Sequence, residues 1–188
     1  MKADRLSYTV IAVLLVSASA CLPTGRAARK SEPSFFSDTT PAKGPWKVEQ
    51  REKDGFYAKV YSHKIEPVII ISSFIEAESP PPVDATNPQN QKALAQGALK
   101  NICEGIGAEC SVRTSDMVWL VGSPLKYIYV RFRAQKGDYP IMTGLMYYRY
   151  DPPIQTMYML MAAERTFPAY EDVFSDYVAG SSFGPEPR

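Results

Sequence analysis

The stretch KYIYVRFRA, residues 126–134, decides the fold because its side chains alternate in character along the chain. From Ile128 to Ala134 the even-numbered residues are apolar, and the odd-numbered residues of the stretch are tyrosine or arginine. Successive side chains of a β-strand point to opposite faces, so one face of this strand belongs to the core. The other face carries Tyr127, Tyr129, Arg131 and Arg133. The segment therefore predicts a strand in a sheet with two different faces.

Three further runs of β-branched, aromatic and methionine residues surround this strand, with turn residues between them. Ser115-Asp116 marks a point where the first run could break. Because the connections are short, the simplest topology is an antiparallel meander. Its four strands are expected at 111–122, 125–135, 139–150 and 154–163.

Two helices and a hairpin complete the predicted domain. Residues 56–62 and 67–75 read as a β-hairpin around a short polar turn. A helix follows over 87–107, with Asn87 as its cap, Pro88 in its first turn and apolar residues at helical spacing up to Ile106. A closing helix runs from about 166 to 180. The order predicts an α+β domain, in which the hairpin and the four-strand meander form an antiparallel sheet with both helices packed on it.

The first 20 residues have the layout of a secretory signal. Lys2 and Arg5 precede an apolar run, Val10–Val16, which ends in small residues. The run is shorter than the ~20 residues that span a bilayer, so a cleaved signal explains it better than a permanent transmembrane helix. We divide the chain into a signal peptide (1–20), a lipidated cysteine with a flexible tether (21–45), a single α+β domain (46–183) and a tail (184–188).

The segment Ala18-Ser19-Ala20-Cys21 resembles the lipobox of bacterial lipoproteins. That resemblance implies that Cys21 becomes the lipidated first residue of the exported protein. Ala18 stands where leucine is usual, and the same small residues suit ordinary signal cleavage, so both routes stay open. Because Leu22 is not aspartate, the resemblance implies an outer-membrane lipoprotein that faces the periplasm of a Gram-negative cell. Its acyl chains would be the contact with the membrane.

The element order, with Ser181-Ser182-Phe183 after the last helix, is similar to the Mog1/PsbP-like fold, which includes small bacterial lipoproteins of the DcrB type. The resemblance covers residues 46–183. It implies an antiparallel sheet with helices on its faces, in proteins that mostly bind other proteins and lack catalytic motifs. The resemblance assigns no functional role to any residue of this chain.

Charge argues against nucleic acid as a partner. Two of the 21 basic and one of the 20 acidic residues lie in residues 1–20, which leaves equal numbers of both in the rest of the chain. Binding to phosphates needs a basic excess that displaces counterions, and the exported part has none.

Cys103 and Cys110 remain as a pair once Cys21 is used at the terminus. An exported protein lies in an oxidising compartment, and the two glycines between these cysteines allow the chain to turn back. We expect a disulfide; two packed free thiols are the alternative. Two sulfurs and the single histidine, His63, fall short of a four-ligand metal set, so no metal site is predicted.

No residue cluster indicates catalysis. His63 lies in a turn and no nucleophile motif accompanies it. The acidic pairs Glu76/Glu78 and Glu171/Asp172 lie in polar surroundings where solvated charge is the ordinary explanation. We therefore expect no catalytic residues, no cofactor and no enzyme activity.

Tyr127, Tyr129, Arg131 and Arg133 are the predicted partner-binding residues, because tyrosine and arginine dominate binding hot spots. The alternative is that the closing helix covers this face, and a fold with both faces covered favours that alternative.

Five methionines fall between Met142 and Met161. Core filling is the favoured role for them, and a lining for an apolar ligand is the other. The leading hypothesis is a tethered envelope lipoprotein that binds an envelope or secreted protein, for example as an immunity or accessory protein of a secretion system. The second is a periplasmic carrier of an apolar small molecule or lipid.

Overall fold

The computed structural model describes residues 41, 44–53, 56–76, 83–120 and 126–181. The proposed signal peptide, Cys21, most of the tether and the C-terminal tail lie outside these residues. No helix among the described residues combines the length and hydropathy needed to cross a bilayer. The elements are β1 (Trp46–Lys53), β2 (Phe56–His63), β3 (Val68–Glu76), α2 (Pro88–Ile106), β4 (Glu109–Trp119), β5 (Lys126–Gln135), β6 (Met142–Asp151), β7 (Ile154–Ala163) and α3 (Pro168–Gly180).

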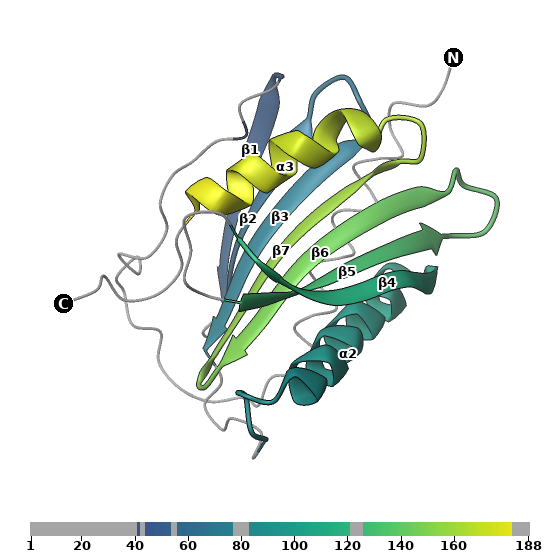
Figure 1. Ribbon diagram of the computed structural model, residues 1–188. Helices are drawn as coiled ribbons and strands as arrows, with labels where there is room; N and C mark the ends of the chain where they lie inside the picture. The colour runs from purple at the N-terminus through teal and green to yellow at the C-terminus, as the bar shows by residue number, and fades with distance from the viewer. Residues whose placement is uncertain (1–40, 42–43, 54–55, 77–82, 121–125, 182–188) are drawn as a thin grey trace.

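The described strands form one antiparallel sheet of seven strands in the order β1-β2-β3-β7-β6-β5-β4 (Figure 1). The α+β class, the hairpin β2–β3 and the meander β4 to β7 are confirmed. The two halves join because β3 pairs along its whole length with β7, from Val68 opposite Ala162 to Glu76 opposite Ile154. This pairing places β1 and β4 at the two edges of the sheet.

Strand β1 is absent from the sequence-based expectation. Its sequence, WKVEQREK, carries charge on both faces and lacks the apolar alternation by which strands are recognised. An edge strand tolerates such charge because only one of its backbone edges is paired. The chain therefore forms a three-stranded N-terminal unit where two strands were predicted.

Strand β4 contains a β-bulge that lies N-terminal to the break considered at Ser115-Asp116. The strand is continuous at Ser115 and Asp116, where a break was considered, and its register with β5 shifts between Val112 and Thr114. Arg113 is the extra residue of this β-bulge, which reverses the alternation of the strand beyond it.

Helix α2 has the caps that its sequence predicts. The Asn87 side chain accepts a hydrogen bond from the Gln89 N–H (2.9 Å), and Gly107 ends the helix in the left-handed conformation. The buried face of the helix lies one residue beyond the predicted apolar positions Leu94, Ala98 and Ile102. Its buried residues are Gln91, Ala95, Leu99, Cys103 and Ile106.

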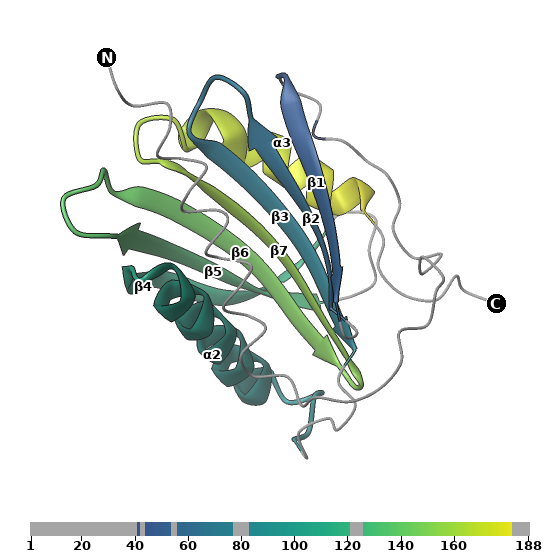
Figure 2. The same cartoon turned by 180° about the vertical axis from the view of Figure 1, so that it is seen from behind.

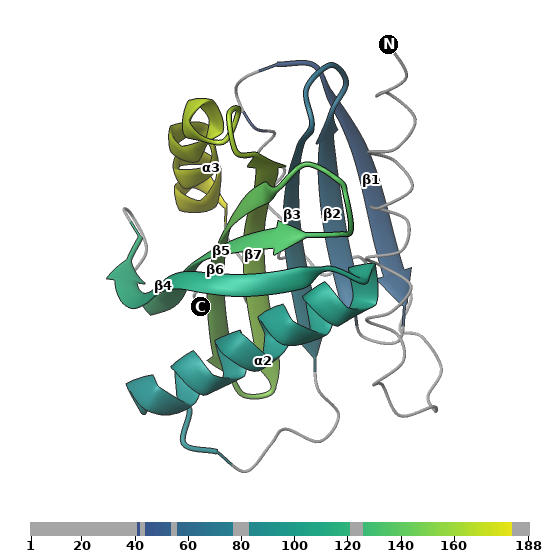
Figure 3. The ribbon, with the colours of Figure 1, turned by 90° about the vertical axis from the view of Figure 1, so that its right-hand side faces the viewer.

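The two helices lie on opposite sides of the sheet, as the side view shows (Figure 3). The view from behind shows α2 along β5 and β6 (Figure 2). On the α2 side, Met146, Met159 and Met161 pack into the core with Val130 and Phe132. On the α3 side the core is aromatic; its members include Tyr61, Tyr127, Tyr147, Tyr158, Phe167, Tyr170, Phe174 and Tyr177.

Candidate functional site

The four residues of the predicted partner-binding face lie under and beside α3. Tyr127 is only 4% exposed and belongs to the aromatic core on that side. Burial raises the pKa of its hydroxyl above the ordinary value. Tyr129 is half-buried, and its ring meets the Tyr147 ring edge to face at a centroid distance of 5.7 Å. The structure thus places the tyrosines in the packing between sheet and helix.

The two arginines of that face bind acidic residues of the same chain. Arg131 pairs with Glu171 of α3 and lies over the Phe167 ring, 5.4 Å from its centre. Arg133 pairs with Glu164 in the turn before α3. Both guanidinium groups therefore fix the start of α3 against β5, and contact with a partner would first have to replace these ion pairs.

The predicted disulfide is present between Cys103 and Cys110, whose Cα atoms lie 6.1 Å apart. It joins the last turn of α2 to the beginning of β4. Gly107 makes the return possible, because its φ of 64° is a left-handed conformation that favours glycine. The bridge holds the helix end beneath the edge of the sheet.

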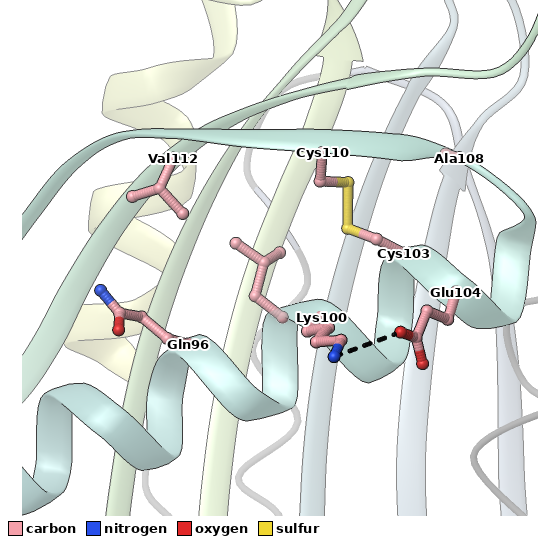
Figure 4. A pocket seen from close by; sticks show the side chains of 8 residues that line it. Gln96, Lys100, Cys103, Glu104, Ala108, Cys110 and Val112 are labelled. Carbon is pink, nitrogen blue, oxygen red and sulfur yellow. Dashed lines mark ion pairs between the residues drawn. A yellow bond between two sulfur atoms is a disulfide. The ribbon is translucent and has the colours of Figure 1, made fainter.

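Beside this disulfide a groove of about 250 Å³ opens between α2 and β4 (Figure 4). Its apolar lining includes Leu99, Cys103 and Cys110. Val112 lies above the helix on the strand (Figure 4). At the rim, Lys100 Nζ lies 3.7 Å from a carboxylate oxygen of Glu104. The groove is thus apolar in its interior and carries balanced charge at its rim.

Strand β4 forms one wall of the groove and is also a free edge. Among the described residues, no strand pairs with its outer side. Its backbone donors and acceptors on that side are open to a partner. Two large apolar side chains are exposed along it: Val112 at 45% and Trp119 at 61%. Exposed apolar residues beside unpaired backbone groups are typical of a protein-binding edge.

The opposite edge differs in its charge. On β1, Lys47 and Arg51 both pair with Glu49, at 2.8 Å and 3.3 Å. Hydrogen bonds from these two cations hold the pKa of the Glu49 carboxyl below its ordinary value. Charged side chains on an edge strand discourage pairing with another strand. The charges of β1 thus pair with one another, whereas the exposed charges of β4, Arg113 and Asp116, form no ion pair with a described residue.

His63 is buried and packed among aromatic rings and backbone groups at the end of β2. The Nδ1 atom of His63 accepts hydrogen bonds from the N–H groups of Ile65 (3.3 Å) and Glu66 (2.9 Å). Its ring packs edge-on against Trp46 and Tyr170. Within the described residues, no group of three or more His, Cys, Asp or Glu side chains is arranged to hold a metal ion. These contacts make His63 part of the hairpin turn and its packing.

Reasoning from sequence missed the edge position of β4. The sequence gives this run less apolar alternation than its neighbours, which agrees with an edge, but the same weakness also suits a broken inner strand. The missing information was the pairing of β3 with β7, which no local pattern contains.

No protein-family model and no curated protein sequence matches the chain. Among solved structures, the chain is similar to the cyanobacterial PsbP protein CyanoP from Synechocystis sp. PCC 6803, at 15% identity and a TM-score of 0.48. That similarity covers 86% of this chain and 98% of CyanoP. The chain is also similar to PA94, a protein of unknown function from Pseudomonas aeruginosa, at 10% identity and a TM-score of 0.44, over 78% of this chain and 86% of PA94.

Proposed function

We propose that the protein is a non-catalytic, membrane-anchored lipoprotein of the bacterial envelope that binds another protein at the β4 edge. One observation carries the proposal: β4 is an edge strand that exposes Val112 and Trp119 and has a groove beside it, whereas the charged residues of the other edge strand, β1, pair with one another. An immunity or accessory role in a secretion system is the biological form that we favour.

Strand addition is the mode of binding that this geometry supports. A partner segment in extended conformation satisfies the outer backbone groups of β4 by main-chain hydrogen bonds. Every second side chain of that segment then points to the α2 side of the sheet. There the groove, which Leu99 helps to line, accepts an apolar side chain, and Lys100 and Glu104 at its rim accept polar contacts. Affinity comes from the backbone and specificity from the groove.

The anchor is part of the same proposal. Cys21 lies outside the described residues, and its support is the lipobox-like sequence that precedes it. Two or more acyl chains hold a protein stably on a membrane, which a single chain does not. Palmitate labelling of the protein in cells, lost in Cys21→Ala, is the expected result. An unlabelled protein released into the soluble envelope fraction would contradict the anchor.

A matched pair of variants tests the binding edge. Val112 and Val48 are both valines on edge strands and both 45% exposed, one on β4 and one on β1. We expect Val112→Asp to abolish co-purification of a partner cross-linked in intact cells, because the new carboxylate would be buried without a counter-charge. Val48→Asp should leave the partner bound.

Both substitutions lie on the surface, so each should change the free energy of unfolding by no more than about 0.5 kcal/mol. Equal loss of the partner in both variants, or retention in both, would refute the β4 edge as the site. Mass spectrometry of the cross-linked product gives the identity of the partner.

A further inference from the structure

Two opposite charges on β4 have no ion-pair partner among the residues that the structure describes. Arg113 and Asp116 are both exposed, and neither forms an ion pair or a side-chain hydrogen bond with any residue that the structure describes. They lie three positions apart on the free edge strand. A partner strand that complements them needs an acidic residue opposite Arg113 and a basic residue opposite Asp116.

The strand β4 itself meets this requirement. When two copies pair antiparallel about a two-fold axis, each contact occurs twice, because residue i of one copy faces residue j of the other and the reverse. If Arg113 lies opposite Asp116 of a second copy, Asp116 lies opposite Arg113 of that copy. One register therefore makes two reciprocal ion pairs from the unpaired charges.

The same register also matches the apolar residues. It places Val112 opposite Met117 of the second copy, and Cys110 opposite its Trp119. The Cys110 sulfur lines the groove between α2 and β4, so the facing indole lies at the groove mouth. Trp119 is the most exposed aromatic ring among the described residues and, as a tryptophan, a common hot spot in interfaces.

The β-bulge gives both apolar pairs of this register a common face. Cys110 and Val112 precede the bulge and lie on the α2 side, opposite core residues of β5. Met117 and Trp119 follow it and lie on the same side, because the extra residue shifts the alternation by one. Opposite residues in an antiparallel pair must share a face, and both apolar pairs do. At the axis Thr114 faces Ser115 of the second copy, and because these two side chains point to opposite faces of the sheet, the ladder is interrupted there.

We propose that the β4 edge binds the β4 edge of a second copy of this chain, so that the two sheets continue across a two-fold axis. This inference rests on the proposed function, because it takes β4 as the protein-binding edge. When no other protein is bound, a second copy of the chain occupies that edge. A different partner would displace the second copy. The dimer protects an edge that would otherwise be open to aggregation.

Charge reversal tests the register. In sedimentation equilibrium of the protein isolated from cells, the wild type should dimerise. Asp116→Arg should raise the dimer dissociation constant about tenfold or more, because it turns two ion pairs into two repulsions. Arg113→Asp should have a similar effect, and the double variant with both charges exchanged should return to within about threefold of wild type. Glu52→Arg on β1 is the control and should leave dimerisation unchanged.

Circular dichroism melting of each variant checks that the fold is intact. A wild type that stays monomeric at high concentration would overturn the inference, as would a dimer in which the exchanged charges fail to restore association. A monomer that still loses its cross-linked partner through Val112→Asp would overturn the self-pairing and leave the proposed function standing.

Discussion

Gly144 on β6 offers the sharpest test of the packing that supports the β4 edge. It lies opposite Phe132 of β5, and the Phe132 ring covers it. A Cβ atom built at Gly144 would lie 2.1 Å from Cζ of that ring and 2.4 Å from Cε1. Real contacts of this kind are about 3.5–4.0 Å between carbon atoms, so the ring would have to move.

The core around the Phe132 ring leaves no space into which the ring could move. Phe132 is fully buried and packs in the α2-side core with Val130 and Met146. Forcing a methyl group into a packed core costs about 1–3 kcal/mol, and replacing glycine in a strand returns about 0.5–1 kcal/mol of backbone entropy. We therefore expect Gly144→Ala to lower the free energy of unfolding by about 1–2 kcal/mol.

Replacing Gly97 by alanine should have the opposite effect and raise the free energy of unfolding. It lies in the middle of α2, is exposed, and a Cβ there would meet nothing within 4 Å. Alanine is favoured over glycine in a helix interior by about 0.8–1 kcal/mol, so Gly97→Ala should stabilise the fold by about that amount.

Urea denaturation followed by circular dichroism measures both changes. In a Phe132→Leu background the cost of Gly144→Ala should disappear, because the smaller side chain leaves room for the methyl group. A Gly144→Ala protein as stable as wild type, or an equal cost in the two backgrounds, would refute the assignment of strain to the Phe132 ring. Phe132 also lies opposite Val112 in the sheet, so its displacement should weaken partner binding at the groove as well.

Three further predictions concern α3, the disulfide and pH. Arg131→Ala should lower the free energy of unfolding by about 1 kcal/mol in urea, because it removes a half-exposed ion pair and a cation–π contact, whereas Arg165→Ala, at an exposed position, should change it little. Cys103→Ser combined with Cys110→Ser should cost about 2–3 kcal/mol, and reductant should destabilise the wild type but not this variant. Burial raises the pKa of Tyr158, so above about pH 10 the folded state keeps a proton that the unfolded chain releases. The free energy of unfolding should therefore be unaffected below about pH 10 and should fall as the pH rises above it. Urea denaturation at a series of pH values measures this change.

The local parts of the fold were predictable because they depend on short-range chemistry. The alternation from Tyr127 to Ala134 separated the two faces of β5: the even-numbered residues pack on the α2 side, and the other face, with Tyr127 and Tyr129, packs on the α3 side. Asn87 and Gly107 marked both ends of α2 for the same reason, since a cap depends on the residue itself and its neighbours. The two cysteines could be paired because they are close in sequence.

The sequence alone could not decide the role of the predicted partner-binding face of β5, which carries Tyr127, Tyr129, Arg131 and Arg133. Alternation shows that Arg131 and Arg133 share a face; it does not show what lies over that face. The decisive residues are Glu171 and Glu164, which are distant in sequence and charged like many surface residues. Their pairing depends on the angle at which α3 returns over the sheet, and that angle follows from core packing on the α3 side.

The edge position of β4 follows from topology, and this is why composition could not find it. Whether β4 is an inner or an outer strand depends on the partner of β7, for which β3 and β4 are the candidates, and β3 is the more apolar of the two. Pairing β7 with β4 would close the meander into a barrel and leave the N-terminal strands without a sheet. Pairing β7 with β3 buries Ile70 and Ile71 on the two faces of a common sheet and leaves the less apolar β4 outside. Because the apolar strand β3 pairs with β7, β4 is left at the edge of the sheet, where its outer backbone groups are unpaired among the described residues.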